Sequence, residues 1–216
     1  YFMKHFKNFK TCVYCTAQTL ASLDETTLAR DYAYLEKYVG IDKVYLETYR
    51  DGTWVAIDHM KMIQNFFKEH GVEIAGGITT VTPPLEKDDA KRQRLFQTFC
   101  YSNETMRTYL KKIVTYTAEL FDEIILDDFF FTSCTCDDCL RERSNLSWAE
   151  FRSNKMIDVA ENLVLKPAKL ANPSVKVTIK YPNWRESYHE TGYVPKIQPS
   201  MFDKIYTGTE TRNTAH

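Results

Sequence analysis

The sequence predicts an α/β fold and, within that class, favours a TIM-type (β/α)8 barrel over an open doubly wound sheet. Segments typical of strands and helices alternate with a repeat of roughly 30 to 45 residues, which indicates a parallel sheet. No glycine-rich phosphate loop follows the first strand, where residues 15–18 read Cys-Thr-Ala-Gln. Polar or aromatic residues follow nearly every strand, as expected for a site built from several strand ends.

The first half of the chain contains the first predicted strands and two predicted helices. Asp24 is expected to cap the first helix, and Gly40 is expected to end it. Asp58 is expected to cap the second helix, which should end at Gly71. The strands of this half are predicted at residues 11–16, 42–49 and 72–81.

The second half continues the alternation. A helix is predicted from Asn103 to Leu120, and a longer one begins at Ser147 and is expected to break near Pro167. Strands are predicted at residues 123–126, 175–180 and 202–206. Six strands are visible where a barrel needs about eight. We therefore expect residues 1–216 to form a single barrel domain that lacks its last strand–helix units.

Composition limits the classes of partner. The chain has 28 basic and 29 acidic residues, a balance that argues against nucleic acid or an acidic membrane surface as a partner. No apolar run approaches the roughly 18 residues needed to span a bilayer. The chain opens on Tyr1 without a signal-peptide pattern, so a leader has been removed or the sequence is a piece of a longer one. Cellular location and oligomeric state stay open, with export as one option.

The stretch that organises the chain is residues 121–139. A short apolar strand ends in two acids, Asp127 and Asp128, and three phenylalanines follow. A parallel strand that ends in acids delivers polar groups to the working face of an α/β fold. An acidic pair at a strand end can also be a helix cap or an ion-pair partner.

A cysteine cluster follows these acids. Cys134, Cys136 and Cys139 are too close together for easy pairwise disulfides, and their spacing is typical of thiolate ligands. Cys100, at the start of the helix that leads into strand four, is the natural fourth ligand. Four thiolates would hold a structural Zn²⁺ that joins two loops and leaves no coordination position for water. Disulfides or free thiols are the alternatives. No organic cofactor is indicated.

Part of the chain resembles a known family. Residues 98–110, strand four and the cysteine run are similar to the β-galactosidases of glycoside hydrolase family 42, and residues 148–152 resemble the helix after that cluster. The resemblance covers residues 98–152. It implies a (β/α)8 barrel in which the four cysteines hold zinc.

Strand four departs from that family. Family 42 ends this strand in Asn-Glu, with the Glu as acid/base, whereas this chain has Asp127 and Asp128. Residues 121–129 are more similar to uncharacterised barrel glycosidase-like proteins whose fourth strand reads F-D-x-I-x-x-D-D. The resemblance thus places the chain in the wider superfamily of barrel glycoside hydrolases.

That superfamily implies hydrolysis of a glycosidic bond in an oligo- or polysaccharide by two carboxyl groups. Because side chains alternate along a strand, Asp127 and Asp128 are expected to diverge. Comparison with Asn-Glu favours Asp128 as catalytic, and the strand-four resemblance favours Asp127, so both stay candidates. Glu210 is the best candidate for the second carboxyl, although it could simply pair with Arg212.

Residues at other strand ends are candidates for binding sugar. Trp54 and Trp184 are the expected stacking platforms, and the remaining candidates are Glu47, Tyr49, Lys180 and Tyr181. Two other functions remain open. A non-catalytic carbohydrate-binding barrel would keep the aromatics and dispense with the acids. A metal-dependent carbohydrate deacetylase would need a catalytic metal bound by Asp and His.

Overall fold

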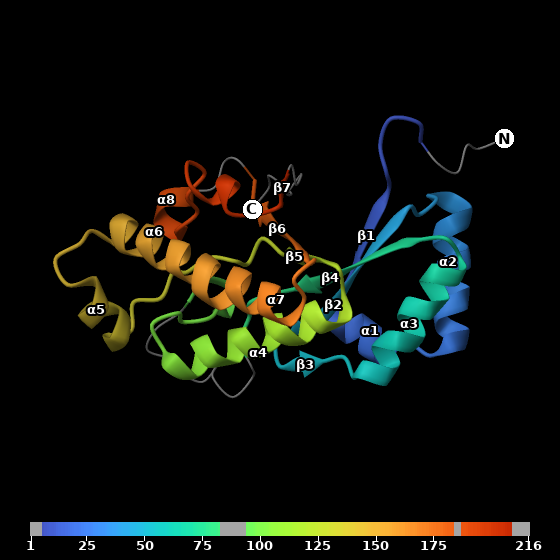
Figure 1. Ribbon diagram of the computed structural model, residues 1–216, viewed down its shortest axis with the longest axis horizontal. Coiled ribbons are helices and arrows are strands. Elements are labelled where there is room, and N and C mark those ends of the chain that lie inside the picture. The colour runs from blue at the N-terminus through green and yellow to red at the C-terminus, as the bar shows by residue number, and fades with distance from the viewer. Residues whose placement is uncertain (1–5, 83–93, 184–186, 209–216) are drawn as a thin grey trace, which may run out of the picture.

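The structure is a computed structural model that describes residues 6–82, 94–183 and 187–208, and one sheet forms its centre (Figure 1). Within these ranges the strand order is β1-β2-β4-β5-β6-β7, and every neighbouring pair on this path is parallel. The strands are β1 (Cys12–Cys15), β2 (Lys43–Arg50), β4 (Glu73–Ile78), β5 (Glu123–Leu126), β6 (Lys176–Tyr181) and β7 (Lys204–Thr207).

The parallel strands follow one another in chain order without a reversal. A doubly wound sheet reverses its strand order at a switch point, whereas a barrel adds each strand beside the previous one. The prediction of a TIM-type α/β fold with an incomplete barrel is therefore confirmed. β5 is the fourth parallel strand and carries the acids at its end.

Helices cover one face of the sheet. α2 and α3 pack together beside its first strands, and α4 packs along α7 and against the middle strands, chiefly β4 (Figure 1). No helix in the described part of the chain combines the length and apolarity needed to cross a membrane. The helices are α1 (Ala17–Ser22), α2 (Glu25–Tyr38), α3 (Ile57–Glu69), α4 (Glu104–Leu120), α5 (Asp137–Arg143), α6 (Trp148–Val159), α7 (Lys166–Ala171) and α8 (Tyr188–Thr191).

The two faces of the sheet have different side chains. On the helix side, alternate strand residues such as Leu46, Ile124 and Val177 are buried in two large apolar clusters. The opposite face, which is the inner face of the barrel, carries a small cluster of buried Tyr45, Ala75 and Ile125, with Tyr14 packed against it. Because the side-chain period of a strand is two, this register also places residues 47 and 127 on the inner face.

The structure confirms some of the predicted helix boundaries and corrects others. Asp24 caps α2 as predicted, and its side chain accepts the Thr27 N–H at 2.7 Å. The predicted cap at Asp58 is wrong, because α3 begins after Ala56 and Asp58 lies in its first turn, where an acid favours the helix dipole. The predicted break at Pro167 is also wrong. A π-helical segment, Ala160–Leu165, precedes α7 and lets the helical path continue to Ala171.

One hairpin is not among the predicted elements. β2 turns through Asp51 and Gly52 into the two-residue strand β3 (Thr53–Trp54), which pairs antiparallel to it. Both turn residues have positive φ, 51° and 81°, which is the geometry of a type I′ turn. Asp-Gly between two strands is a known signal for this turn, so the hairpin was predictable.

Candidate active site

Polar side chains from neighbouring strands meet at one edge of the inner face. Glu47 lies near the end of β2, Thr79 follows β4, Asp127 follows β5 and Lys180 lies near the end of β6. The carboxyl ends of parallel strands share one edge of a sheet, so residues far apart in sequence become neighbours. The structure thus brings together three of the residues predicted from strand ends: Glu47, Asp127 and Lys180.

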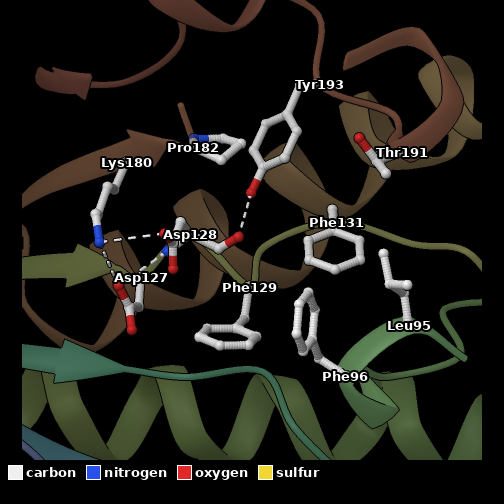
Figure 2. A pocket seen from close by; sticks show the side chains of 10 residues that line it. All are labelled: Leu95, Phe96, Asp127, Asp128, Phe129, Phe131, Lys180, Pro182, Thr191 and Tyr193. Atoms are coloured by element: carbon white, nitrogen blue, oxygen red, sulfur yellow. Dashed lines mark hydrogen bonds and ion pairs between the residues drawn. The ribbon is translucent and has the colours of Figure 1, made fainter. Parts of the chain in front are cut away.

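Asp127 is buried, and both of its carboxylate oxygens have donors. Oδ1 accepts hydrogen bonds from Lys180 Nζ at 3.0 Å and from the backbone N–H of Asp128 at 3.0 Å. Oδ2 lies 3.2 Å from Arg50 Nη2. Two cations therefore hold this carboxylate in one orientation (Figure 2 shows the lysine).

Glu47 was predicted to bind substrate, and the structure does not support this. Its side chain is fully buried and accepts hydrogen bonds at 2.7 Å from the Tyr14 hydroxyl and from the Ala17 N–H. Arg50 Nε lies 2.9 Å from Oε2. A further bond comes from the Thr79 hydroxyl. Because protein donors occupy both oxygens, Glu47 anchors Arg50, which in turn reaches Asp127.

Tyr14, on β1, extends over the neighbouring strand β2, so that its hydroxyl donates to Glu47 and lies against Gly77 of β4. A Cβ atom added to Gly77 would lie 2.7 Å from the Tyr14 hydroxyl oxygen, which is too close for any side chain. Desolvation raises the pKa of Tyr14 well above its ordinary value of 10.0, so the hydroxyl stays protonated and donates to Glu47. Gly77 therefore makes room for one of the bonds that fix the buried carboxylate.

Asp128 also lies close to Lys180, whose Nζ is 3.4 Å from Oδ2. Its backbone carbonyl accepts a hydrogen bond from the Tyr193 hydroxyl at 2.7 Å. Burial raises the pKa of Tyr193 well above its ordinary value of 10.0, which keeps this hydroxyl a donor. The contact fixes the backbone that carries the second acid. Figure 2 shows Lys180 and Tyr193 on either side of the Asp128 residue.

A pocket opens beside the two acids. It has a volume of about 350 Å³ and is polar at one end and apolar at the other (Figure 2). Pockets of this size suit small organic ligands. The lining residues are Leu95, Phe96, Asp127, Asp128, Phe129, Phe131, Lys180, Pro182, Thr191 and Tyr193.

The apolar end is built by two segments that are distant in sequence. The Phe96 ring lies edge-to-face with the rings of Phe129 and Phe131, at centroid distances of 5.4 and 6.4 Å. The run of phenylalanines after the acids was visible in the sequence. Leu95 and Phe96 had no comparable local signal, because only the tertiary structure brings that segment against the end of β5.

Three other predicted sugar-binding residues do not line this pocket. Tyr49 is fully buried, and its hydroxyl donates to the Val81 carbonyl at 2.9 Å. Trp54 packs against α4, where its Nε1 donates to the Tyr109 hydroxyl at 2.8 Å. Tyr181 is buried, and that burial raises its pKa to about 12. All three side chains therefore pack within the protein. Trp184 and Glu210 lie outside the described residues.

The four predicted metal ligands come together. The sulfur of Cys100 lies 3.5 Å from that of Cys136 and 3.6 Å from that of Cys139, and the last two are 3.7 Å apart. All four sulfurs, including that of Cys134, lie within 4.8 Å of one another. Zn–S bonds of about 2.3 Å in a tetrahedron imply S···S edges of about 3.8 Å, whereas a disulfide needs about 2.05 Å. The geometry fits a metal and not a disulfide.

The pKa values of the cysteine thiols also favour a bound cation. Hydrogen bonds with Cys134 and Cys139, together with burial, raise the pKa of the Cys100 thiol, while the bond with Cys100 lowers the pKa of Cys134. Protein groups alone therefore do not favour four thiolates side by side. A divalent cation would supply the missing positive charge. The donor set of four soft thiolates suits Zn²⁺.

A family model shows which protein family this chain belongs to. Residues 1–216 match the family described as "probable glycosyl hydrolase, catalytic domain", and the chain belongs to that family.

A relative and two solved structures are similar to this chain, and the solved structures share its fold. The chain is 34% identical over 230 residues to an uncharacterised protein of Saccharolobus solfataricus, matching 95% of this chain and 38% of that protein. The β-galactosidase from the psychrophilic Marinomonas ef1 has the same fold, with a TM-score of 0.66 and 11% identity over 94% of this chain and 41% of its own. The α-L-fucosidase isoenzyme 2 of Paenibacillus thiaminolyticus has a TM-score of 0.59 and 13% identity over 92% and 40%. The chain thus spans about two fifths of each of these proteins.

Proposed function

We propose that this protein hydrolyses O-glycosidic bonds in a carbohydrate bound at the pocket beside Asp127 and Asp128. The observation that carries the proposal is the position of these acids: both line a pocket at the carboxyl end of the fourth parallel strand. Membership in the glycosyl hydrolase family supports the reaction class. Glycoside hydrolysis needs carboxyl groups held beside the scissile bond, and this edge of the sheet supplies two.

The two acids have different surroundings, and we assign them different roles. Both oxygens of Asp127 already accept bonds from the side chains of Arg50 and Lys180 and from a backbone N–H, so it serves as a fixed negative charge. Asp128 lies one residue further along the lining and would donate the proton to the leaving oxygen as the bond from that oxygen to the anomeric carbon breaks. A water molecule would supply the hydroxyl to the anomeric carbon. Its proton would pass to a second carboxylate, for which Glu210 remains our candidate.

We also propose that Cys100, Cys134, Cys136 and Cys139 hold a structural Zn²⁺. Their sulfur–sulfur distances support the proposal. The metal would fasten the segment before α4 to the loop after β5. Since all four positions around it would be thiolates, it would take no direct part in the chemistry.

The test is digestion of a glycan panel by the protein and by Asp127→Asn and Asp128→Asn variants. Loss of a general acid costs about 10²- to 10⁴-fold in rate, so Asp128→Asn should abolish most sugar release while the circular dichroism spectrum is unchanged. The matched control is Asp31→Asn, which neutralises an exposed acid paired with Arg30 on α2. That variant should release sugar at the parent rate.

Binding without cleavage would overturn the proposal. If sugars bind but none is released even at high protein concentration, the chain acts as a carbohydrate-binding barrel. A deacetylase would instead require a catalytic metal on Asp and His. Among the described residues, the one cluster with metal-ligand geometry is all-cysteine, so we do not propose that activity.

A further inference from the structure

We infer that the apolar end of the pocket binds an aryl or alkyl group, so that the substrates are glycosides with an apolar aglycone. That the bound molecule is a glycoside rests on the proposed function, whereas the binding of an apolar group does not. Leu95, Phe96, Phe129 and Phe131 form this apolar end.

The polar side chains beside this wall already have protein partners. The Ser133 hydroxyl beside it accepts the Leu95 N–H at 2.7 Å. The Thr191 hydroxyl has backbone carbonyl partners at 3.3 Å within α8. A sugar hydroxyl buried against the phenyl rings would lose its hydrogen bonds to water without replacing them, which is unfavourable. An apolar group meets no such cost.

The backbone conformation at Phe96 also supports a ligand site at this wall. Its backbone has a φ of 52°, and that of the next residue, Gln97, is 56°, which is the left-handed region that β-carbon sterics disfavour. Neighbouring bonds hold this strained turn, since the Thr82 N–H and hydroxyl both donate to the Gln97 carbonyl at 2.9 Å. The result is an aromatic side chain that is 56% exposed at the pocket rim. The strained turn places this ring against Phe129 and Phe131 and still leaves more than half of its surface open, so a ligand in the pocket can contact it.

The apolar wall and the two acids belong to one continuous pocket. Phe129 directly follows Asp128 and lines the same cavity, with the Arg50 guanidinium 5.6 Å from its ring centroid. Figure 2 shows the rings of Phe129 and Phe96 extending from the acids to the far wall. A bond positioned at Asp128 therefore has a polar region on one side and an apolar one on the other. The sugar needs the polar side, so the apolar side receives the leaving group.

The probe is benzyl alcohol, titrated against the full chain and followed by saturation-transfer NMR of its phenyl protons. We expect saturable binding that a Phe96→Gly variant weakens by about tenfold, because a ring–ring contact is lost. Glycine accepts positive φ, so this variant should melt no lower than the parent. Phe129→Leu, read in the same way, provides a second test that is independent of the strained turn.

Two controls separate the inference from the proposed function. Tyr38→Ala removes an exposed ring on α2, far from the pocket in the sequence and outside its lining, and should leave binding unchanged. Asp128→Asn should also bind the probe as the parent does. Absence of binding, or equal binding by the parent and both phenylalanine variants, overturns the inference even if glycans are cleaved. Phenylalanine-dependent binding without glycan cleavage would sustain the apolar site and reject the proposed function.

Discussion

The guanidinium of Arg50 lies 3.2 Å from the carboxylate of Asp127, so a residue at the end of β2 reaches past β4 to the acid that follows β5. The same guanidinium contacts buried Glu47 through its Nε. A planar fork can bond to two carboxylates in a fixed geometry, whereas an ammonium group is a point charge. Arg50 is therefore a positioning residue whose shape matters as much as its charge.

We predict that Arg50→Lys lowers kcat/KM by about 10- to 100-fold, because a lysine cannot hold Glu47 and Asp127 at once. The matched control is Arg107→Lys. Arg107 has a side-chain exposure of 20% against 21% for Arg50 and also pairs with an aspartate, Asp158, but it lies on α4. Steady-state kinetics on a cleaved substrate, with melting curves for both variants, checks the prediction. Equal losses in the two variants would contradict a positioning role.

We predict one Zn²⁺ per chain by elemental analysis, lost in Cys100→Ser and Cys139→Ser. Removal of the metal should also disturb the apolar end of the pocket, since Ser133, next to Cys134, binds the Leu95 backbone. Weaker benzyl alcohol binding after chelation would report this. Cys12→Ser, at an exposed thiol on β1, is the control and should keep the metal. A metal-free protein with the parent's melting temperature would contradict the structural role.

We predict that Glu123, at the start of β5, makes the stability of the fold depend on pH. Burial alone would raise its pKa, but hydrogen bonds from Lys204 and Lys43 outweigh this and lower it below its ordinary value of 4.5. A lowered pKa in the folded state stabilises the protein above pH 4.5, and this stabilisation disappears as the pH falls through the folded pKa.

The measurement is urea unfolding from pH 7 downward. Glu123→Gln should lower the free energy of unfolding by about 1.5–3 kcal/mol at neutral pH, and the difference from the parent should vanish in acid. Glu119→Gln, on the exposed side of α4, should follow the parent at every pH. A pH-independent difference for Glu123→Gln would assign the effect to packing.

We predict that Gly77→Ala lowers both stability, by about 1–3 kcal/mol, and activity, because the new methyl group displaces Tyr14 from Glu47. Gly71→Ala is the control. Gly71 has a φ of 72° with open space around it, so its substitution should cost about 1 kcal/mol through backbone strain and leave kcat/KM unchanged. If folded Gly77→Ala retained its activity, the contact between Tyr14 and Glu47 would not be needed for the reaction.

The barrel class is predictable from the sequence because alternating apolar segments and helix caps such as Asp24 are local signals. Cys100 is predictable as the fourth ligand because it lies at the start of the helix that leads into the strand before the cysteine run, and the four sulfurs do meet. Glu47 and Tyr49 are sugar-binding candidates in the sequence because a polar or aromatic residue near a strand end has the same signature whether it faces a pocket or the interior. Burial distinguishes the two, and burial depends on neighbouring strands.

The sequence by itself determined the order of the parallel strands, the acids at the end of the fourth one and the run of three cysteines, because each is written in a continuous stretch of residues. Only the tertiary structure decided which side chains share the pocket and which support it. Arg50, Phe96 and Lys180 come from three separate segments, and their meeting with Asp127 and Phe129 depends on parallel register and loop conformation. Those properties follow from packing across the sheet, which no local pattern encodes.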